Sequence, residues 1–341
     1  MKPLLGILLI AIGSIGASSF YVPFKKVKKW AWESYWITQG VAAWIIAPWL
    51  FAYLTLPDGT LLDIISESPT TAKWWAIFFG ALWGVGGLTF GLSIRYLGVA
   101  LGQSIALGFC AAFGTLIPPV VAGENLFSSA SGILMLIGVA ICVSGIAIIG
   151  YAGALKNKGL SAEEKKRAVK EFALKKGLII AVFAGIMSAC FSYGIESGSP
   201  IAETARSFGT NPLYLTNPVL IFILLGGFFT NFVYCAYLNI KNKTGKDYVS
   251  GGANIFFNNL FFTFLAGFLW FMQFQFFGMG KSQLPVSMSI FAWSILMALN
   301  IAFSNIWGIF LKEWKGTGAK TVIILLIGIL VLILSTFVVN L

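Results

Sequence analysis

Apolar stretches long enough to cross a lipid bilayer alternate with short polar gaps along the whole chain. A bilayer core of about 30 Å needs roughly 20 apolar residues in a helix. Segments of that length predict ten transmembrane helices, over residues 3–21, 31–56, 74–94, 99–121, 131–151, 177–197, 217–240, 253–278, 285–311 and 321–340. The pattern therefore predicts an all-α membrane protein.

Composition and charge agree with this fold class. Hydrophobic residues make up 58% of the 341 residues and charged residues only 10%, which leaves no room for a sizeable soluble domain. All but four of the lysines and arginines lie in the gaps after the odd-numbered helices, the exceptions being Lys2, Lys73, Arg206 and Lys281. Because Lys and Arg resist translocation, these gaps are expected in the cytoplasm and both termini outside it. The net charge of +11 thus reflects topology, and no nucleic-acid partner is expected.

An internal repeat divides the chain. Gly13, Ala17 and Tyr21 recur at a constant offset as Gly185, Ala189 and Tyr193, and a second constant offset relates Gly80, Leu82, Trp83, Phe90 and Gly91 to Gly267, Leu269, Trp270, Phe277 and Gly278. We expect two five-helix repeats, over residues 1–155 and 177–341, joined by a cytoplasmic connector over 156–176. Five is an odd number, so the second repeat would enter the membrane inverted, as the halves of many transporters do.

Polar side chains inside the apolar spans are mostly amides and tyrosines. They donate and accept hydrogen bonds, as sugar hydroxyls require, and tryptophan faces suit the C–H side of a pyranose ring. A neutral polyol therefore fits this interior better than an ion does. Helix 253–278 is the best candidate for a binding helix, and the substrate-binding candidates are Tyr21, Trp83, Gln103, Tyr193, Asn258, Asn259, Trp270 and Gln273.

Two carboxylates are candidates for coupling transport to protons. Glu33 begins the second helix, and Glu196 lies near the end of the sixth. Glu33 is the preferred proton-coupling residue; the alternatives are an ion pair of Glu33 with Lys28 or Lys29, and a solvated helix end for Glu196. Sodium coupling also stays open, because a carboxylate with amide oxygens can ligate a hard cation. The four cysteines fall inside spans, where we expect packing residues and neither a disulfide nor a metal site.

Several motifs resemble those of the bacterial L-rhamnose/proton symporter family. They are FYVPFKKVKKWAWE at 20–33, WGVG at 83–86, RYLG at 95–98, LKKG at 174–177, NPLY at 211–214 and LKEW at 311–314. This resemblance implies a ten-helix member of the drug/metabolite transporter superfamily that imports a 6-deoxy sugar with a proton across the bacterial inner membrane. It places Tyr21, Lys25, Glu33, Trp83, Arg95, Asn259, Trp270 and Gln273 on family-pattern positions.

The chain departs from the family pattern at four positions of the expected cavity. Gly87 and Thr89 stand where the family has amides, Asn258 stands where it has a histidine, and Gln103 is a polar residue that the pattern lacks. The function expected from sequence is thus sugar/proton symport, most simply of L-rhamnose, with L-fucose or another sugar left open.

Two other functional classes compete with a transporter. An intramembrane enzyme would need a nucleophile and a base, but the chain has no histidine and no suggestive Ser/Asp or Cys/Asp spacing, so no enzyme and no cofactor are expected. A sensor or channel that binds a solute without pumping it stays open. The expected partners are a small sugar, a proton and the lipid bilayer, and the oligomeric state is not predicted.

Overall fold

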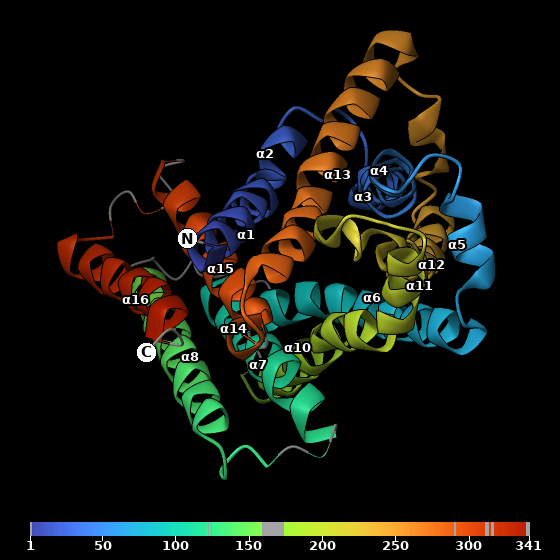
Figure 1. Ribbon diagram of the computed structural model, residues 1–341. Helices are drawn as coiled ribbons and strands as arrows, with labels where there is room; N and C mark the ends of the chain where they lie inside the picture. The colour runs from blue at the N-terminus through green and yellow to red at the C-terminus, as the bar shows by residue number, and fades with distance from the viewer. Residues whose placement is uncertain are drawn as a thin grey trace. The chain divides into compact units, whose positions relative to one another are not determined.

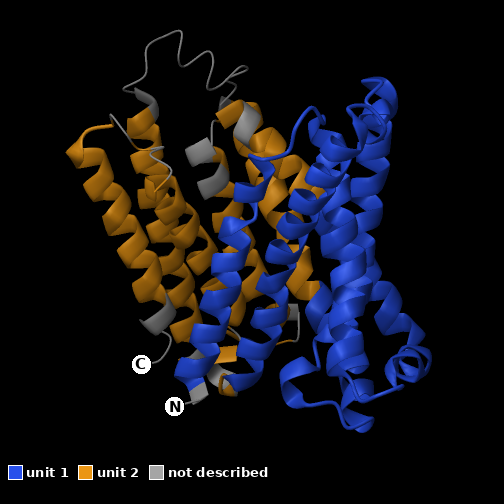
Figure 2. Ribbon diagram, turned by 90° about the horizontal axis from the view of Figure 1, so that it is seen from above, with its two compact units in different colours: residues 1–84, 194–283 blue, residues 85–193, 284–341 orange. Residues whose placement is uncertain are grey.

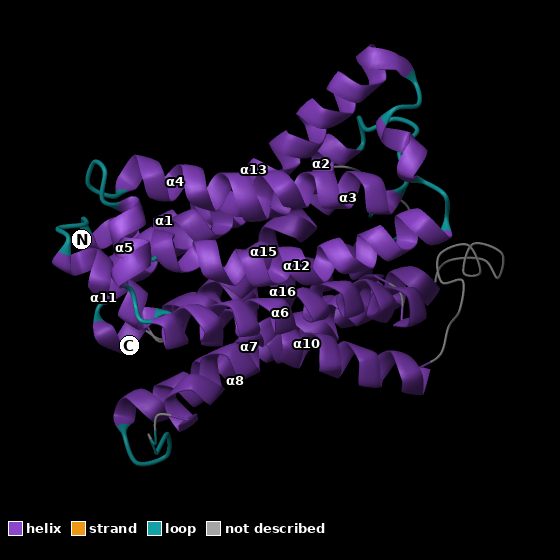
Figure 3. Cartoon of the chain, turned by 90° about the vertical axis from the view of Figure 1, so that its right-hand side faces the viewer, coloured by secondary structure: helices purple, strands orange, loops and turns teal. Residues whose placement is uncertain are grey.

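The computed structural model describes residues 2–97, 99–121, 123, 125–158, 174–289, 291–310, 314 and 317–338. Every regular element within those residues is helical (Figure 3). The greater part of the expected connector, residues 159–173, lies outside the described residues.

Eight helical segments are long and apolar enough to cross a membrane: Pro3–Phe24, Trp32–Thr55, Thr70–Ser93, Gly132–Lys156, Lys175–Ser207, Pro212–Lys241, Gly252–Gln283 and Ala292–Phe310. They confirm an α-helical, multi-pass membrane protein. The two remaining expected spans, 99–121 and 321–340, coincide with the shorter apolar stretches Ile105–Val120 and Ala319–Ser335.

The chain forms two compact units, coloured separately in Figure 2. The first comprises residues 1–84 and 194–283. Its helices are α1 (Lys2–Ser19), α2 (Tyr21–Phe24), α3 (Trp32–Gly40), η1 (Val41–Ile46), α4 (Ala47–Thr55), α5 (Leu61–Glu67), the start of α6 (Thr70–Leu97), α11 (Ser199–Ser207), η2 (Pro212–Tyr214), α12 (Asn217–Lys241), η3 (Gly245–Tyr248) and α13 (Gly252–Gln283). Helix α13 packs along α1, as Figure 1 shows, and also contacts α3 and η1.

The second unit comprises residues 85–193 and 284–341. It holds the end of α6, then α7 (Val99–Val121), α8 (Ala130–Lys158), most of α10 (Leu174–Ser197), α14 (Val286–Ser289), α15 (Ala292–Phe310) and α16 (Ala319–Val338). Helix α8 packs against both α7 and α16. Each unit draws on both halves of the chain, and the division falls inside α6 and α10.

A wide turn interrupts the second transmembrane segment. Between α3 and α4 the backbone is π-helical over Val41–Ile46. Pro48 lies two residues beyond this turn. It has no N–H to donate to the carbonyl of Trp44, four residues earlier, and a proline ring clashes with that carbonyl in a regular α-helix. A π-turn before a proline is a common way to absorb this mismatch, and such turns are frequent at functional sites.

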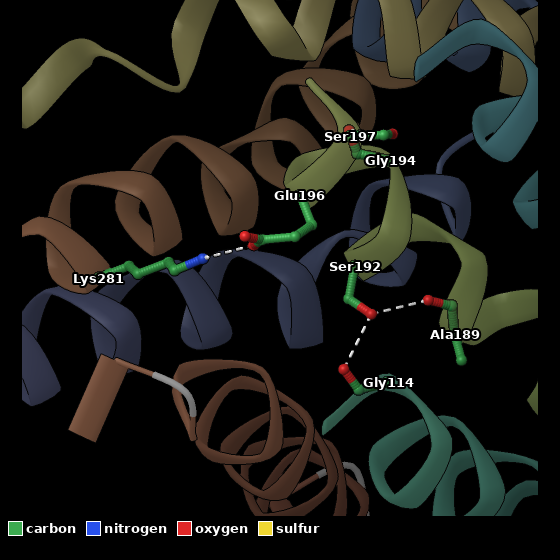
Figure 4. A network of polar contacts seen from close by, with 7 residues as sticks. All are labelled: Gly114, Ala189, Ser192, Gly194, Glu196, Ser197 and Lys281. Atoms are coloured by element: carbon green, nitrogen blue, oxygen red, sulfur yellow. Dashed lines mark hydrogen bonds and ion pairs between the residues drawn. The ribbon is translucent and has the colours of Figure 1, made fainter. Parts of the chain in front are cut away.

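Two prolines also leave carbonyl groups without helical partners in α7. Pro118 and Pro119 lie inside the helix, so the carbonyl oxygens of Gly114 and Thr115 receive no i→i−4 bond. The hydroxyl of Ser192 lies 2.9 Å from the Gly114 oxygen and 2.9 Å from that of Ala189 (Figure 4). A side chain of α10 thus satisfies a backbone group that would otherwise be unpaired at membrane depth.

Candidate functional site

Glu33 lies in the first turn of α3, buried with 5% of its surface exposed. Its Oε1 accepts hydrogen bonds from the Asn242 amide at 2.9 Å and from the Thr244 hydroxyl at 2.8 Å. Both donors come from the polar segment that joins α12 to α13. Glu33 therefore ties α3 to a loop more than two hundred residues away in sequence.

A second buried carboxylate holds the same loop to α3. Asp247 Oδ2 accepts from the backbone N–H of Ala31 at 2.7 Å and from the Ser34 hydroxyl at 2.9 Å. Ala31 immediately precedes α3, so Asp247 supplies the acceptor that the start of a helix lacks.

The two carboxylates are joined through Asn239. Its Oδ1 lies 3.2 Å from the Thr244 hydroxyl and 3.2 Å from the Ser34 hydroxyl. Each hydroxyl has one hydrogen, so each can donate either to its carboxylate or to Asn239. Glu33, Thr244, Asn239, Ser34 and Asp247 thus form one continuous chain of polar groups, which we call the carboxylate network.

Tyr248 borders the carboxylate network on the loop side. Its hydroxyl interacts with Ser34 and Asn239, and burial raises the pKa of this tyrosine. A raised pKa keeps the phenol in its neutral, hydrogen-donating form over the physiological pH range.

No lysine in the described part of the chain forms an ion pair with Glu33. The alternative pairing with Lys28 or Lys29 is therefore not formed here. Lys29 adopts a left-handed backbone with φ of 61°, in the loop between α2 and α3.

Asn258 and Asn259 hold the basic loop in place. Asn259 is fully buried; its Oδ1 accepts from the backbone N–H of Lys28 at 2.9 Å and its Nδ2 donates to the Lys28 carbonyl at 2.7 Å. Asn258 Nδ2 donates to the Lys26 carbonyl at 2.9 Å. In this conformation both amides are hydrogen-bonded to backbone groups, and their role in sugar binding stays a prediction.

Tryptophans from three transmembrane segments meet inside the first unit. The ring centroid of Trp44 lies 6.1 Å from that of Trp83 and 5.8 Å from that of Trp270, in both cases edge to face. Trp83 and Trp270 are 5.6 Å apart, and Phe274 packs 5.0 Å from Trp270. We call Trp44, Trp83 and Trp270 the tryptophan cluster. The structure thus brings together two of the predicted sugar-binding residues.

The remaining predicted sugar-binding residues differ in their surroundings. Gln273 is buried on α13, and its Nε2 donates to the Trp270 carbonyl at 3.1 Å. Tyr21 is exposed, and its ring contacts Phe20 and Phe24. Tyr193, in the second unit, donates to the Phe113 carbonyl at 3.0 Å. Gln103 belongs to α7, but its side chain lies outside the described residues.

Glu196 differs from Glu33 in its surroundings. It is exposed on α10, and its Oε2 lies 3.8 Å from Lys281 Nζ (Figure 4). Such an exposed pair is screened by solvent and contributes little to stability.

Sequence reasoning did not single out most of the carboxylate network. Asn239, Thr244 and Asp247 lie at a span end and in a short gap, where polar residues are ordinary. The available signal was the acid Asp247 in a gap otherwise rich in lysine. Trp44 was also missed, since its contacts come from helices distant in sequence.

Comparison with known proteins places the whole chain in one family. A family model for the L-rhamnose-proton symport protein matches residues 2–341. L-rhamnose-proton symporters of Yersinia pestis (strain Pestoides F) and Yersinia pseudotuberculosis (serotype O:1b, strain IP 31758) are each 36% identical to it over 352 aligned positions, which cover 99% of this chain and 97% of theirs. A helical, multi-pass chain matched over its full length in this way belongs to the L-rhamnose-proton symport protein family.

Proposed function

We propose that this protein is a secondary active transporter that imports L-rhamnose with a proton across the bacterial inner membrane. The family is one of symporters, not of enzymes. The observation that carries the coupling mechanism is Glu33, a buried carboxylate at the start of a candidate span, held by two neutral donors and no described cation.

The carboxylate network can accommodate both protonation states of Glu33. When Glu33 is ionised, the Thr244 hydroxyl donates to it at 2.8 Å. When Glu33 carries a proton, the same hydroxyl can turn to Asn239 Oδ1, 3.2 Å away, and stay hydrogen-bonded. Neither state leaves the hydroxyl unpaired, which lowers the cost of exchanging the proton.

Protonation of Glu33 would change how tightly the α12–α13 loop is held. Hydrogen bonds to a charged acceptor are roughly twice as strong as those between neutral groups. Neutralising Glu33 therefore weakens its bonds from Asn242 and Thr244, while Asp247 keeps its own hold on α3. A ligand shifts a conformational equilibrium only if it interacts differently with the two conformations. The proton meets this condition, because binding to Glu33 weakens the bonds that hold the α12–α13 loop to α3.

One proton is sufficient to drive accumulation of a neutral sugar. Moving one charge through about 100 mV releases roughly 2.3 kcal/mol, which corresponds to about a 50-fold concentration ratio.

The tryptophan cluster supplies the sugar-binding surface in this proposal. Trp83 and Trp270 offer apolar faces for the ring C–H groups and the 6-methyl of a deoxyhexose, and Gln273 on the same helix offers a polar group. The other predicted residues stay secondary candidates for sugar binding, which other conformations of the transport cycle would test: Tyr21, Gln103, Tyr193, Asn258 and Asn259.

We further propose ten transmembrane helices in two inverted repeats, and packing within the first unit supports this. Gly80 of α6 lies so close to the Ile223 carbonyl of α12 that a Cβ would collide with it. The repeat-related Gly267 of α13 approaches the second segment in the same way, with a Cβ position 2.7 Å from the Gln39 carbonyl. Reciprocal contacts of equivalent helices are the pattern that a two-fold relation produces.

The charge distribution supports an orientation with both termini in the periplasm. The basic loop before α3 and the α12–α13 loop would then both face the cytoplasm. Glu33 lies next to these loops, a position suited to releasing a proton on the cytoplasmic side.

Uptake by purified protein in proteoliposomes tests this function. Labelled L-rhamnose and L-fucose are offered with an inward proton gradient, with a sodium gradient, and with neither. We expect accumulation of L-rhamnose with the proton gradient alone. Accumulation of L-fucose alone would show that the substrate is L-fucose, and accumulation with the sodium gradient alone would show that the coupling ion is sodium. Equilibration of the sugar without accumulation would indicate a channel.

A further inference from the structure

Gln39 is a buried residue of the first unit whose side-chain amide lacks hydrogen bonds to any described residue. It lies in α3, one residue before Gly40, the last residue of that helix, and none of its surface is exposed. Neither its amide nitrogen nor its amide oxygen has a hydrogen-bond partner among the residues that the structure describes. A buried amide without partners is destabilising, so its presence calls for a group that pairs with it in another state.

Trp44 shows the same property one π-turn further along. It is 3% exposed, and within the described part of the chain its indole N–H has no hydrogen-bond partner. Its ring lies over Gly40, where a Cβ would sit 2.6 Å from ring atom Cε3. The π-helical turn Val41–Ile46 thus carries a second unpaired donor and turns its ring toward Trp83 and Trp270.

The close approach of α13 fixes this turn. A Cβ on Gly267 would meet the Gln39 carbonyl at 2.7 Å and the Ala43 nitrogen at 3.0 Å. Three polar atoms, two on Gln39 and one on Trp44, are therefore held on a tightly packed segment that contributes Trp44 to the tryptophan cluster.

We propose that Gln39 and Trp44 form the hydroxyl-recognising part of the sugar site, an inference that rests on the proposed function. The Gln39 amide pairs with two neighbouring hydroxyls, accepting from one and donating to the other, and the Trp44 indole N–H donates to a further sugar oxygen. The matching ligand class is a neutral deoxyhexose with a vicinal diol, whose apolar side lies on Trp83 and Trp270.

Binding and stability measured on the same variants test this assignment. Gln39→Leu keeps the size of the side chain and removes the unpaired amide. We expect its affinity for L-rhamnose to fall by about 10- to 100-fold, because the sugar hydroxyls are left unpaired, whereas its unfolding temperature without sugar stays equal to that of wild type or rises. A structural glutamine would behave in the opposite way, with stability lost and affinity kept.

Trp44→Phe has a matched control. Trp30 is also buried, and no described residue pairs with its indole N–H, but its ring packs on Tyr248 and Phe256, outside the tryptophan cluster. We expect Trp44→Phe to weaken L-rhamnose binding several-fold and Trp30→Phe to leave it unchanged.

Singly deoxygenated L-rhamnose analogues give the sharpest readout. For the two analogues that each lack one of the hydroxyls paired with Gln39, wild type should lose affinity. The affinity of Gln39→Leu should not fall further with either analogue, since this variant has no amide to pair with the missing hydroxyl. Wild-type affinity in Gln39→Leu, or a lower unfolding temperature with affinity retained, would overturn the assignment and leave sugar transport standing. Failure of wild type to bind either L-rhamnose or L-fucose would overturn the proposed function and this inference together.

Discussion

Trp83 and Trp270 lie in contact, with ring centroids 5.6 Å apart, and they are the two tryptophans that the internal repeat pairs with each other. Residues related by a two-fold axis meet when they lie beside that axis. A transporter with inverted halves binds its substrate at the interface of the repeats. The contact therefore connects the proposed repeat with the proposed position of the sugar.

The first prediction concerns the close contact of α6 with α12. Gly80→Ala should destabilise the protein by about 3 kcal/mol or prevent its folding, because the new methyl group meets the rigid backbone at Ile223. Gly91→Ala on the same helix is the control: it meets no atom within 4 Å and should leave stability unchanged or raise it by about 0.5–1 kcal/mol. Thermal unfolding in detergent measures both, and equal effects of the two would contradict the packing.

The second prediction concerns the carbonyl that Pro118 leaves free. Ser192→Ala should destabilise the protein by about 1–2 kcal/mol, since the Gly114 oxygen loses its hydroxyl partner. In a Pro118→Ala background the restored N–H bonds to Gly114, so the same change should cost less. A double-mutant cycle on unfolding free energies measures the difference, and additive effects would show that the two features are independent.

The third prediction concerns the hold of Asn259 on the basic loop. Asn259→Ala removes two bonds to Lys28 and leaves both backbone groups unpaired, so we expect a loss of about 2–3 kcal/mol. Asn258→Ala removes a single bond to the Lys26 carbonyl from a less buried position and should cost about 1 kcal/mol or less. Chemical or thermal unfolding ranks the two, and the reverse order would be inconsistent with the geometry.

Sequence alone predicted the fold class and eight of the membrane spans, because the thickness of a bilayer sets the length of apolar helix that is needed to cross it. It also named Trp83 and Trp270 as candidate sugar-binding residues, and the structure places their rings in contact. It did not predict Trp44, or any member of the carboxylate network other than Glu33. Asp247 and Ala31 are 216 positions apart, and no local pattern reveals a hydrogen bond at that separation. The hydrogen bonding of Asn259 to the Lys28 backbone could not be predicted for the same reason.

The fourth prediction concerns Asp247. Asp247→Asn keeps a side chain of the same size but replaces a charged acceptor for Ala31 and Ser34 by a neutral one. Since each bond to a charged group contributes roughly 1.5–3 kcal/mol and each neutral one about 1, the change in both bonds should lower stability by about 1–4 kcal/mol. Proton-driven uptake of L-rhamnose should persist in this variant, because Glu33 is intact; loss of coupling at unchanged stability would move the proton site to Asp247.

The most direct test of the account compares two transport modes of Glu33→Gln in proteoliposomes. If Glu33 carries the proton, the variant exchanges labelled for unlabelled L-rhamnose across the membrane but no longer accumulates it when a proton gradient is imposed. Glu196→Gln, which alters an exposed carboxylate paired with Lys281, keeps both activities. Accumulation by Glu33→Gln that matches wild type and keeps its dependence on the proton gradient would contradict the central claim.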